Sequence, residues 1–279
     1  MSERERYPPG VPCWVETLQP DPQAALEFYG PLFGWEFVGP GPMPGDPPGR
    51  YFVARLRGRD VAGIGSSTNR SGAPAPTWST YVRVASAGEA AEKAKKAGGS
   101  VRDGPFDVLP AGRMAVLADP AGALVCVWEA RARDGAQLVN EPRAWAMSVL
   151  DTTDPEGAKA FYGAVFGWQP ESFDAAGARM TLWRLPGYVG GEPEQPVPRD
   201  VVGVMIAGEG SPGAAPPHWS VELWVDSADA TAEHAARLGG KVIVPPHDTP
   251  GFRSAVVKDP QGAVFSVSNL RAGPQRNAA

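Results

Sequence analysis

The spacing of apolar residues predicts two short amphipathic helices with nearly the same sequence, one in each half of the chain. In each helix Phe, Tyr and a later Phe recur at helical spacing, after an opening Asp-Pro pair and before a glycine that ends the helix. The two copies occupy residues 28–35 and 161–168. Other short motifs recur in the same order, at 60–63 and 200–203, 78–79 and 219–220, and 119–122 and 259–262. We therefore expect two homologous halves.

Elsewhere apolar and polar residues alternate over short runs, which is typical of strands. In the first half the pattern predicts helices over 22–32 and 87–97 and strands over 11–19, 51–57, 61–66, 78–84, 101–103, 114–118 and 124–128. In the second half it predicts helices over 155–165 and 228–238 and strands over 144–151, 179–185, 200–206, 219–225, 241–244, 253–257 and 263–269.

Prolines and glycines predict loops over residues 36–50 and 71–77. A polar, charged segment between the halves predicts a linker, and the end of the chain has no pattern. The expected organisation is a first module over 1–129, a linker over 130–143, a second module over 144–270 and a tail over 271–279.

Composition restricts the cellular compartment and the class of partner more than it restricts the function. The net charge of −5 gives no basic footprint for nucleic acid or an anionic membrane. Residues 1–10 lack the apolar core of a secretory signal, and no apolar run approaches the roughly 18 residues that span a bilayer. Two cysteines are too few for a disulfide scaffold. We expect a cytoplasmic monomer or homodimer with a small organic ligand and no nucleic-acid or membrane partner.

Three motifs carry a family resemblance: the Asp-opened Phe-Tyr helix, the Trp-Ser strand before a helix ended by Gly-Gly, and the Asp-Pro-x-Gly-Ala turn. Over residues 11–129 and 144–270 the chain resembles the vicinal oxygen chelate superfamily, which includes glyoxalases, bleomycin-resistance proteins and extradiol dioxygenases. Residues 13–16, 111–114 and 138–141 are similar to tandem actinobacterial proteins often labelled hydroxylase or culture-filtrate antigen. The resemblance implies an α+β fold of four βαβββ units that form two curved sheets, each with a cleft.

The resemblance also implies where metal-dependent members place their ligands. Counting from the motifs gives the six positions Trp14, Ser79, Cys126, Met147, Ser220 and Ser266. None is His or Glu, and neither Trp nor Met supplies a suitable ligand for a hard or borderline ion. We therefore expect no metal and no other cofactor. The three histidines, His218, His234 and His247, are interpreted as structural or solvent-facing.

Strand alternation extends these positions into two cleft faces. The residues expected in the first cleft are Trp14, Glu16, Leu18, Ser79, Tyr81, Arg83, Cys126 and Trp128. The residues that alternation gives for the second are Met147, Val149, Asp151, Ser220, Glu222, Trp224 and Ser266, and Trp183 is also expected in that cleft. Aromatic walls with few polar groups favour a flat organic ligand.

The first cleft combines groups for proton transfer. Desolvation can raise the pKa of Glu16 and make it a base, with Tyr81 as proton donor and Arg83 or Arg113 as partner of a substrate oxyanion. The alternative for Glu16 is an ion pair with Arg83 across the strands. Arg113 and Arg253 occupy matching places before the Asp-Pro turns; a salt bridge or carbonyl contact within the turn is the alternative to binding an anionic oxygen. Cys126 fits a small buried hydrophobe better than a nucleophile.

Three functions remain open from the sequence. The first is a metal-independent enzyme of specialised, antibiotic-type metabolism that isomerises, cyclises or eliminates on a small aromatic or polyketide-like molecule. The second is a protein that sequesters such a molecule, as bleomycin-resistance proteins do, and the third is a metal-dependent lyase or oxygenase. The expected substrate-binding residues are Trp14, Ser79, Cys126, Trp128, Met147, Ser220, Glu222, Trp224 and Arg253.

Overall fold

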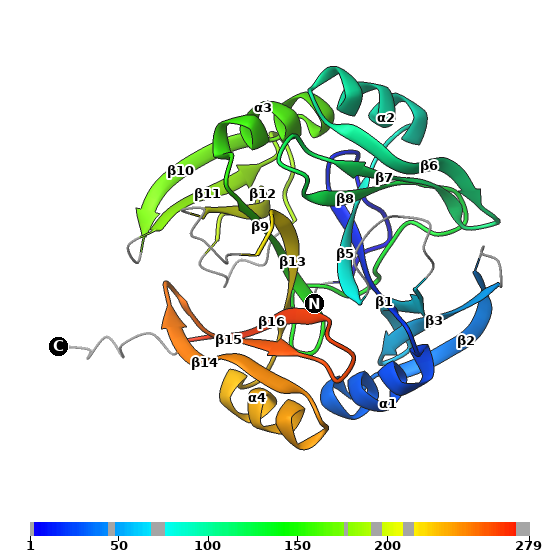
Figure 1. The fold of residues 1–279 in the computed structure, drawn as a ribbon, viewed down its shortest axis with the longest axis vertical. Helices are drawn as coiled ribbons and strands as arrows, with labels where there is room; N and C mark the ends of the chain where they lie inside the picture. The colour runs from blue at the N-terminus through cyan, green and yellow to red at the C-terminus, as the bar shows by residue number, and fades with distance from the viewer. Residues whose placement is uncertain are drawn as a thin grey trace.

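Each half of the chain forms one α+β module built on an eight-stranded sheet, as the computed structural model in Figure 1 shows. The structure describes residues 3–43, 48–67, 76–175, 178–190, 197–208 and 215–271. The first module contains α1 (Pro22–Phe33), α2 (Ala87–Lys96), β1 (Pro12–Gln19), β2 (Glu36–Met43), β3 (Gly49–Leu56), β4 (Arg59–Ser66), β5 (Thr77–Arg83), β6 (Ser100–Val108), β7 (Gly112–Ala118) and β8 (Leu124–Ala130).

The second module repeats this order of elements. It contains α3 (Pro155–Phe166), α4 (Ala228–Arg237), β9 (Trp145–Thr152), β10 (Gln169–Ala175), β11 (Ala178–Arg184), β12 (Val201–Ala207), β13 (His218–Trp224), β14 (Lys241–Thr249), β15 (Phe252–Lys258) and β16 (Val264–Leu270). The strands of the two sheets lie in the orders β2-β3-β4-β1-β5-β8-β7-β6 and β10-β11-β12-β9-β13-β16-β15-β14. The expected duplicated α+β fold is confirmed, and helices lie on the outside of both sheets (Figure 1).

The sequence prediction was wrong about the edge strands β2 and β10. Residues 36–50 were predicted as a loop, but β2 pairs antiparallel with β3 as far as Met43. Prolines are tolerated there because an edge strand leaves one row of backbone groups unpaired, and the register shifts between Val38 and Gly41. The exposed strand β10 was not predicted because its apolar pattern is weak. Residues 71–75 and 272–279, which belong to the predicted loop 71–77 and tail, lie outside the described residues.

The repeated helices have the predicted start and end signals. The Asp21 side chain caps α1 by accepting from the amides of Gln23 and Ala24, and Gly34 ends the helix with φ of +67°, in the left-handed region that favours glycine. The buried face of α1 packs against the other module, where the rings of Phe28 and Phe265 lie 6.5 Å apart. Figure 1 shows α1 beside α4 and α2 beside α3, so each module covers part of its neighbour.

Two reciprocal hydrogen bonds cross between the modules. The Tyr29 hydroxyl donates to Asp259 Oδ2 at 2.9 Å, and the Tyr162 hydroxyl donates to Asp119 Oδ2 at 3.1 Å. In each Asp the other oxygen, Oδ1, accepts from backbone amides of its own Asp-Pro turn. The repeated tyrosine therefore ties a helix of one module to the turn before the last strand of the other.

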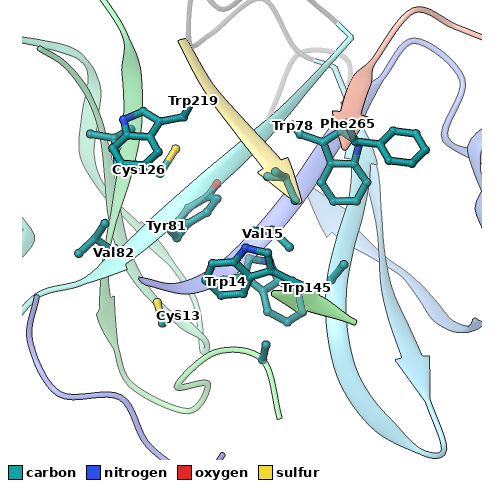
Figure 2. Packing of buried hydrophobic residues seen from close by; sticks show 14 of the residues in the cluster. Cys13, Trp14, Val15, Trp78, Tyr81, Val82, Cys126, Trp145, Trp219 and Phe265 are labelled. Carbon is teal, nitrogen blue, oxygen red and sulfur yellow. The ribbon is translucent and has the colours of Figure 1, made fainter. Parts of the chain in front are cut away.

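Indole groups complete this interface. Trp78 Nε1 donates to the Tyr29 hydroxyl at 3.1 Å, and Trp219 Nε1 donates to the Tyr162 hydroxyl at 2.7 Å. Figure 2 shows Trp78 of β5 against Phe265 of β16, with ring centroids 6.4 Å apart. No helix of the described residues is long and apolar enough to cross a membrane.

Removing either cross-module hydroxyl is expected to lower the free energy of unfolding. Tyr29→Phe and Tyr162→Phe should each lose about 1–2 kcal/mol in urea denaturation. The loss should be larger for Tyr162→Phe. In Tyr29→Phe the acceptor Asp259 Oδ2 still has a second donor, Gln19 Nε2 at 2.8 Å, whereas Tyr162 is the side-chain donor to Asp119 Oδ2. Glu27→Gln, on the exposed side of α1, is the control and should stay within about 0.5 kcal/mol. Unchanged stability in both tyrosine variants would contradict the role of these bonds.

Candidate functional site

A cavity of about 500 Å³ lies inside the curve of the first sheet. Strands β2 and β6 are the two edges of that sheet, and both contribute to the wall, so the sheet curls around the cavity. The side chains that alternation assigns to this cleft are, with the exception of Arg83, among the lining residues: Trp14, Glu16, Leu18, Ser79, Tyr81, Cys126 and Trp128. Period-two alternation therefore found most of the inner face.

Glu16 is the centre of the polar groups in the cavity. Its carboxylate accepts from the Tyr81 hydroxyl on Oε1 at 2.5 Å and from the Tyr51 hydroxyl on Oε2 at 2.7 Å. The Tyr51 hydroxyl in turn accepts from Trp14 Nε1 at 3.0 Å. Figure 2 shows Trp14 and Tyr81 close together on β1 and β5. The result is one carboxylate held between two phenols, with 6% of Glu16 exposed.

Burial raises the pKa of Glu16 above its ordinary value, and the hydrogen bonds from Tyr81 and Tyr51 partly oppose that shift. Burial also raises the pKa of both tyrosines well above 10, to which the charge of Glu16 adds. Ionised phenols are therefore strongly disfavoured here. The cavity holds a proton-accepting carboxylate and two hydroxyls that keep their protons at neutral pH.

Tyr51 was missed by the sequence analysis. It lies on β3, two strands away from Glu16 in the sheet, and its ring crosses β4 to reach the carboxylate. Alternation along β3 would have placed Tyr51 on the inner face together with Val53, which also lines the cavity. The cleft faces were predicted by alternation from the expected metal-ligand positions, and β3 carries none of these positions. Tyr51 therefore did not enter the prediction.

Two glycines of β4 make room for the Tyr51 ring. A Cβ at Gly63 would collide with the Tyr51 hydroxyl, and a Cβ at Gly65 would lie 2.9 Å from Tyr51 Cδ2. Neither glycine has φ in the left-handed region, so the backbone alone does not call for glycine at these positions. The second-module counterpart Gly203 has no such neighbour, and its nearest atoms are 3.5 Å away.

The expected cationic partners of a substrate lie elsewhere. Arg83 donates to the carbonyl of Val84, and its Nε lies 3.8 Å from Asp134 Oδ1 rather than beside Glu16. The structure therefore does not form the alternative Glu16–Arg83 ion pair. Asp134 belongs to the linker, which therefore lies beside Arg83 at the C-terminal end of β5.

Arg113 and Arg253 are both held by carboxylates. Arg113 Nη1 lies 3.3 Å from Asp107 Oδ1, and Arg253 Nε lies 2.5 Å from Asp229 Oδ2. On β7 the neighbour Met114 lines the cavity, so Arg113 lies on the opposite face of the strand. Both arginines form salt bridges, as the alternative interpretation expected, but their partners lie on β6 and in α4 rather than within the Asp-Pro turns.

A different cation, Arg133, lines the cavity. It comes from the linker, to which the sequence analysis gave no part in the site. Gly135 of the same segment is also a lining residue, and the next residue, Ala136, donates its amide to the Cys13 carbonyl at 2.8 Å. The linker thus forms part of the cavity wall.

The residues at the three ligand positions of the first module do not fit a metal ion. Trp14 Nε1 already donates a hydrogen bond, and an indole N–H has no lone pair to offer. Burial raises the pKa of Cys126, which opposes the thiolate that a metal needs. Ser79 leaves one neutral hydroxyl. Within the described ranges, no three residues among His, Cys, Asp and Glu group around a metal-sized position.

Cys126 and two of the histidines are placed as the sequence analysis interpreted them. Cys126 is buried, with 5% exposed, and lies opposite Tyr81 in the β5–β8 pairing. His218 and His247 are exposed, and each contacts the carbonyl oxygen of a nearby proline through Nδ1. His234 lies in α4, near its last turn.

The second module does not repeat the Glu16 cluster. Glu222 stands where the first module has Tyr81, and its partner is the Ser268 hydroxyl at 2.6 Å. Burial raises the pKa of Glu222. Ser220 donates to the Val149 carbonyl, and Trp224 is half-buried. Met147 borders a separate cavity of about 50 Å³, which has room for water but not for a ring compound.

Trp183 was expected in the second cleft, and this prediction was wrong. Its side chain is fully buried, 5.6 Å from Tyr162 and 5.8 Å from Trp168 between ring centroids. Trp183 pairs with Gly203 on β12, and a glycine there leaves space for a large ring. The aromatic residue therefore belongs to the core around the repeated helix.

The rim of the first cavity is apolar. From the β2 edge it receives Val38, which is 48% exposed, and from beyond β6 it receives Leu109, which is 71% exposed. Exposed apolar side chains are costly to hydrate, and at a cavity mouth they are typical of a ligand-binding surface. Trp14 and Trp128 add ring surface further in.

Comparisons with known proteins agree with this architecture. The model of the glyoxalase/bleomycin resistance protein/dioxygenase superfamily matches residues 14–127, and the glyoxalase-like domain model matches residues 147–268. The chain is 40% identical to CFP32 of Mycobacterium tuberculosis, named as a glyoxylase, over 99% of this chain and 100% of that protein. It is 35% identical to the anthracycline biosynthesis protein DnrV of Streptomyces peucetius over 96% of each.

Solved structures share the fold at low sequence identity. The Mn(II)-bound glyoxalase of Novosphingobium aromaticivorans has a TM-score of 0.60 and 16% identity, and the match covers 94% of this chain and 82% of that one. The 2,3-dioxygenase LapB of Pseudomonas sp. KL28 has a TM-score of 0.61 and 12% identity, with 100% and 96% covered. The chain belongs to the glyoxalase/bleomycin resistance protein/dioxygenase superfamily. Within it, the chain is a tandem protein related to CFP32 and DnrV.

The raised pKa of Glu16 predicts how folding stability changes with pH. The folded state keeps the Glu16 proton at a pH where the unfolded chain, with a glutamate pKa of about 4.3, has released it. Stability should therefore fall, relative to Glu16→Gln, as pH rises above about 4. The fall should end once the folded pKa is passed. Urea unfolding of both proteins between about pH 4 and 8 measures the difference. A difference independent of pH would contradict the shift, and Glu27→Gln controls for the lost charge.

The fit between Gly63 and Tyr51 predicts a coupling between the two positions. Gly63→Ala should destabilise the protein by about 1–3 kcal/mol through overpacking. In a Tyr51→Ala background the same change should cost clearly less, because the clashing ring is gone and the close contact that remains is with Glu16 Cβ at 3.0 Å. The matched control is Gly203→Ala, whose added methyl meets ordinary contact distances. Equal losses in both backgrounds would show that Gly63 is needed for another reason.

Proposed function

We propose that the first module is a metal-independent enzyme that transfers a proton on a small aromatic or polyketide-like molecule, in an isomerisation, cyclisation or elimination. The observation that carries this proposal is the buried Glu16 carboxylate between Tyr51 and Tyr81, inside a cavity whose walls are mainly apolar. A buried carboxylate with a raised pKa that lines a ligand-sized cavity is typical of functional sites.

Glu16 acts as the general base. Desolvation raises its pKa toward the operating pH, where a general base transfers protons most effectively. The two phenol hydroxyls keep it from becoming a permanently protonated acid, because both donate to the ionised form. The proton is taken from a carbon beside a carbonyl group of the bound molecule, and the electron pair of that C–H bond moves onto the carbonyl oxygen as an enolate.

Tyr81 returns a proton to the ligand at a second atom. The high pKa of Tyr81 makes a free phenolate unfavourable. Tyr81 therefore gives its proton to the ligand while the protonated Glu16 carboxyl, 2.5 Å away, transfers a proton to the Tyr81 oxygen. The proton that Glu16 took from carbon therefore replaces the one that Tyr81 gave. No proton is gained or lost overall, which is the balance of an isomerisation. Tyr51 is held by Trp14 and positions the carboxylate.

The shape and surface of the cavity favour a flat ring compound. A volume of about 500 Å³ accommodates several fused rings, and Trp14 and Trp128 provide faces for stacking. DnrV is named as an anthracycline biosynthesis protein, and this relationship supports an aromatic or polyketide-like substrate. Exposed Val38 and Leu109 let an apolar part of the ligand extend through the rim.

Two alternatives use the same cavity differently. A binding protein that sequesters a ring compound needs the apolar walls but no base, and the bleomycin-resistance part of the superfamily name supports this function. A metal-dependent lyase or oxygenase needs ligands that Trp14, Ser79 and Cys126 do not provide. Elemental analysis of the purified protein tests the metal alternative, which requires a stoichiometric ion and loss of activity with a chelator.

Deuterium exchange tests the proposed chemistry before the natural substrate is known. In D₂O the protein should catalyse exchange at the acidic carbon of aromatic ketones such as 2-tetralone, measured by mass spectrometry. Glu16→Gln should lower the catalysed rate by about 10²- to 10⁴-fold, because the base is removed while the cavity stays similar in shape. Glu222→Gln in the second module is the matched control and should leave the rate unchanged.

The outcomes separate the alternatives. Tight binding without exchange, in both the unmodified protein and Glu16→Gln, would favour sequestration over catalysis. Exchange that persists in Glu16→Gln would contradict the assignment of the base. Exchange that is lost with a chelator and restored by a divalent metal would favour the metal-dependent alternative.

A further inference from the structure

Arg133 reaches the cavity from the linker and is fixed at both its backbone and its side chain. Its amide donates to the Ala111 carbonyl at 3.1 Å, and its carbonyl accepts from Trp128 Nε1 at 2.8 Å. Its guanidinium Nη1 lies 3.1 Å from Asp60 Oδ2. A cation held in this way has already lost much of its conformational freedom, so a ligand that binds it loses less entropy.

Arg133 is not required to neutralise Asp60. The other oxygen of Asp60 lies 2.7 Å from Arg55 Nε, so two guanidinium groups share one carboxylate. In the second module the matching carboxylate, Asp200, has both oxygens paired with the single residue Arg184, at 2.9 and 2.8 Å. Arg184 also contacts Glu171, so in the second module one arginine lies between two carboxylates. The first module instead sets two arginines against the one carboxylate of Asp60, which leaves one positive charge unmatched within this group.

The unmatched charge is available from the cavity. Arg133 lines the cavity, and 38% of its side chain is exposed. A guanidinium has five N–H donors, and the contact with Asp60 engages one nitrogen. The field of Arg133 reaches the site, since it opposes the rise in the pKa of the Tyr51 hydroxyl. The remaining donors suit an anionic oxygen.

We propose that Arg133 is a binding residue for an anionic oxygen of the ligand, so that the ligand class is a flat ring compound bearing a carboxylate, phenolate or enolate. This inference rests on the proposed function only in taking the first cavity as the ligand site, and it holds for catalysis and for sequestration. Arg133 of the linker then binds the substrate oxyanion, the role that the sequence predicted for Arg83 or Arg113. The carboxylates of Glu16 and Asp103 also line the cavity and oppose an anion there, which favours a ligand whose charge lies beside Arg133.

A matched pair of probes tests this preference. The anion 2-naphthoate and its neutral amide, 2-naphthamide, have the same ring and nearly the same shape. Calorimetry at pH 7 should show the carboxylate binding more tightly to the unmodified protein, on the order of tenfold, as expected for a charged hydrogen-bonded pair. In Arg133→Gln the preference should disappear while the amide keeps its affinity. Arg133→Lys should keep part of the preference, because it retains the charge but not the planar fork.

The matched control is Arg131→Gln, two residues earlier in the linker. Arg131 pairs with Asp107 on the exposed side and is not a cavity residue, so the naphthoate preference should remain. Thermal unfolding of each variant shows whether it is folded. If Arg133→Gln is not folded, the reduced naphthoate preference expected of Arg133→Lys is the test, and an unchanged preference in that variant would contradict the site. Equal affinity for both probes, or a preference that Arg133→Gln keeps, would overturn the anion site alone. Failure of both probes to bind at millimolar concentration would overturn the ligand site itself, and with it the proposed function.

Discussion

The structure depends on the two hydrogen bonds by which Tyr29 and Tyr162 cross to the Asp-Pro turns of the opposite modules. Each acceptor oxygen belongs to a buried carboxylate whose second oxygen already caps its own turn. A carboxylate in that position is stable only when both oxygens have donors, so neither module satisfies its turn alone. The repeated Phe-Tyr helix is therefore the surface on which the two modules recognise each other.

With this pairing on the helix side, the inner face of the first sheet is available to line a cavity. The helices and the module interface bury the outer faces, while the inner face of the first sheet curls around the cavity. Burial of Glu16 raises its proton affinity, and the hydroxyls of Tyr51 and Tyr81 are the donors that partly oppose this shift. Burying the Glu16 carboxylate costs free energy, and the stable interface between the modules offsets that cost.

The sequence predicted those parts that follow from local pattern. Capping residues and apolar spacing located the four helices of the described residues, and alternation on β1, β5 and β8 placed Trp14, Glu16 and Tyr81 together. It could not show that Tyr51 crosses β4, because that contact depends on which strands are neighbours. Arg133 was also beyond it, since a linker has no periodicity that reveals which face it covers. Proline-rich β2 was missed because local propensity favours a loop, and pairing with β3 decides otherwise.

The contribution of the linker has a consequence for how duplicated proteins diverge. In a symmetric dimer of separate chains both clefts are identical, and any change alters both at once. Joining two copies end to end creates one segment that occurs once and lies beside one cleft. Here that segment supplies Arg133 and Gly135 to the first cavity. The fusion itself thus breaks the symmetry, and selection can then specialise one cleft while the other copy preserves the partnership that keeps both folded.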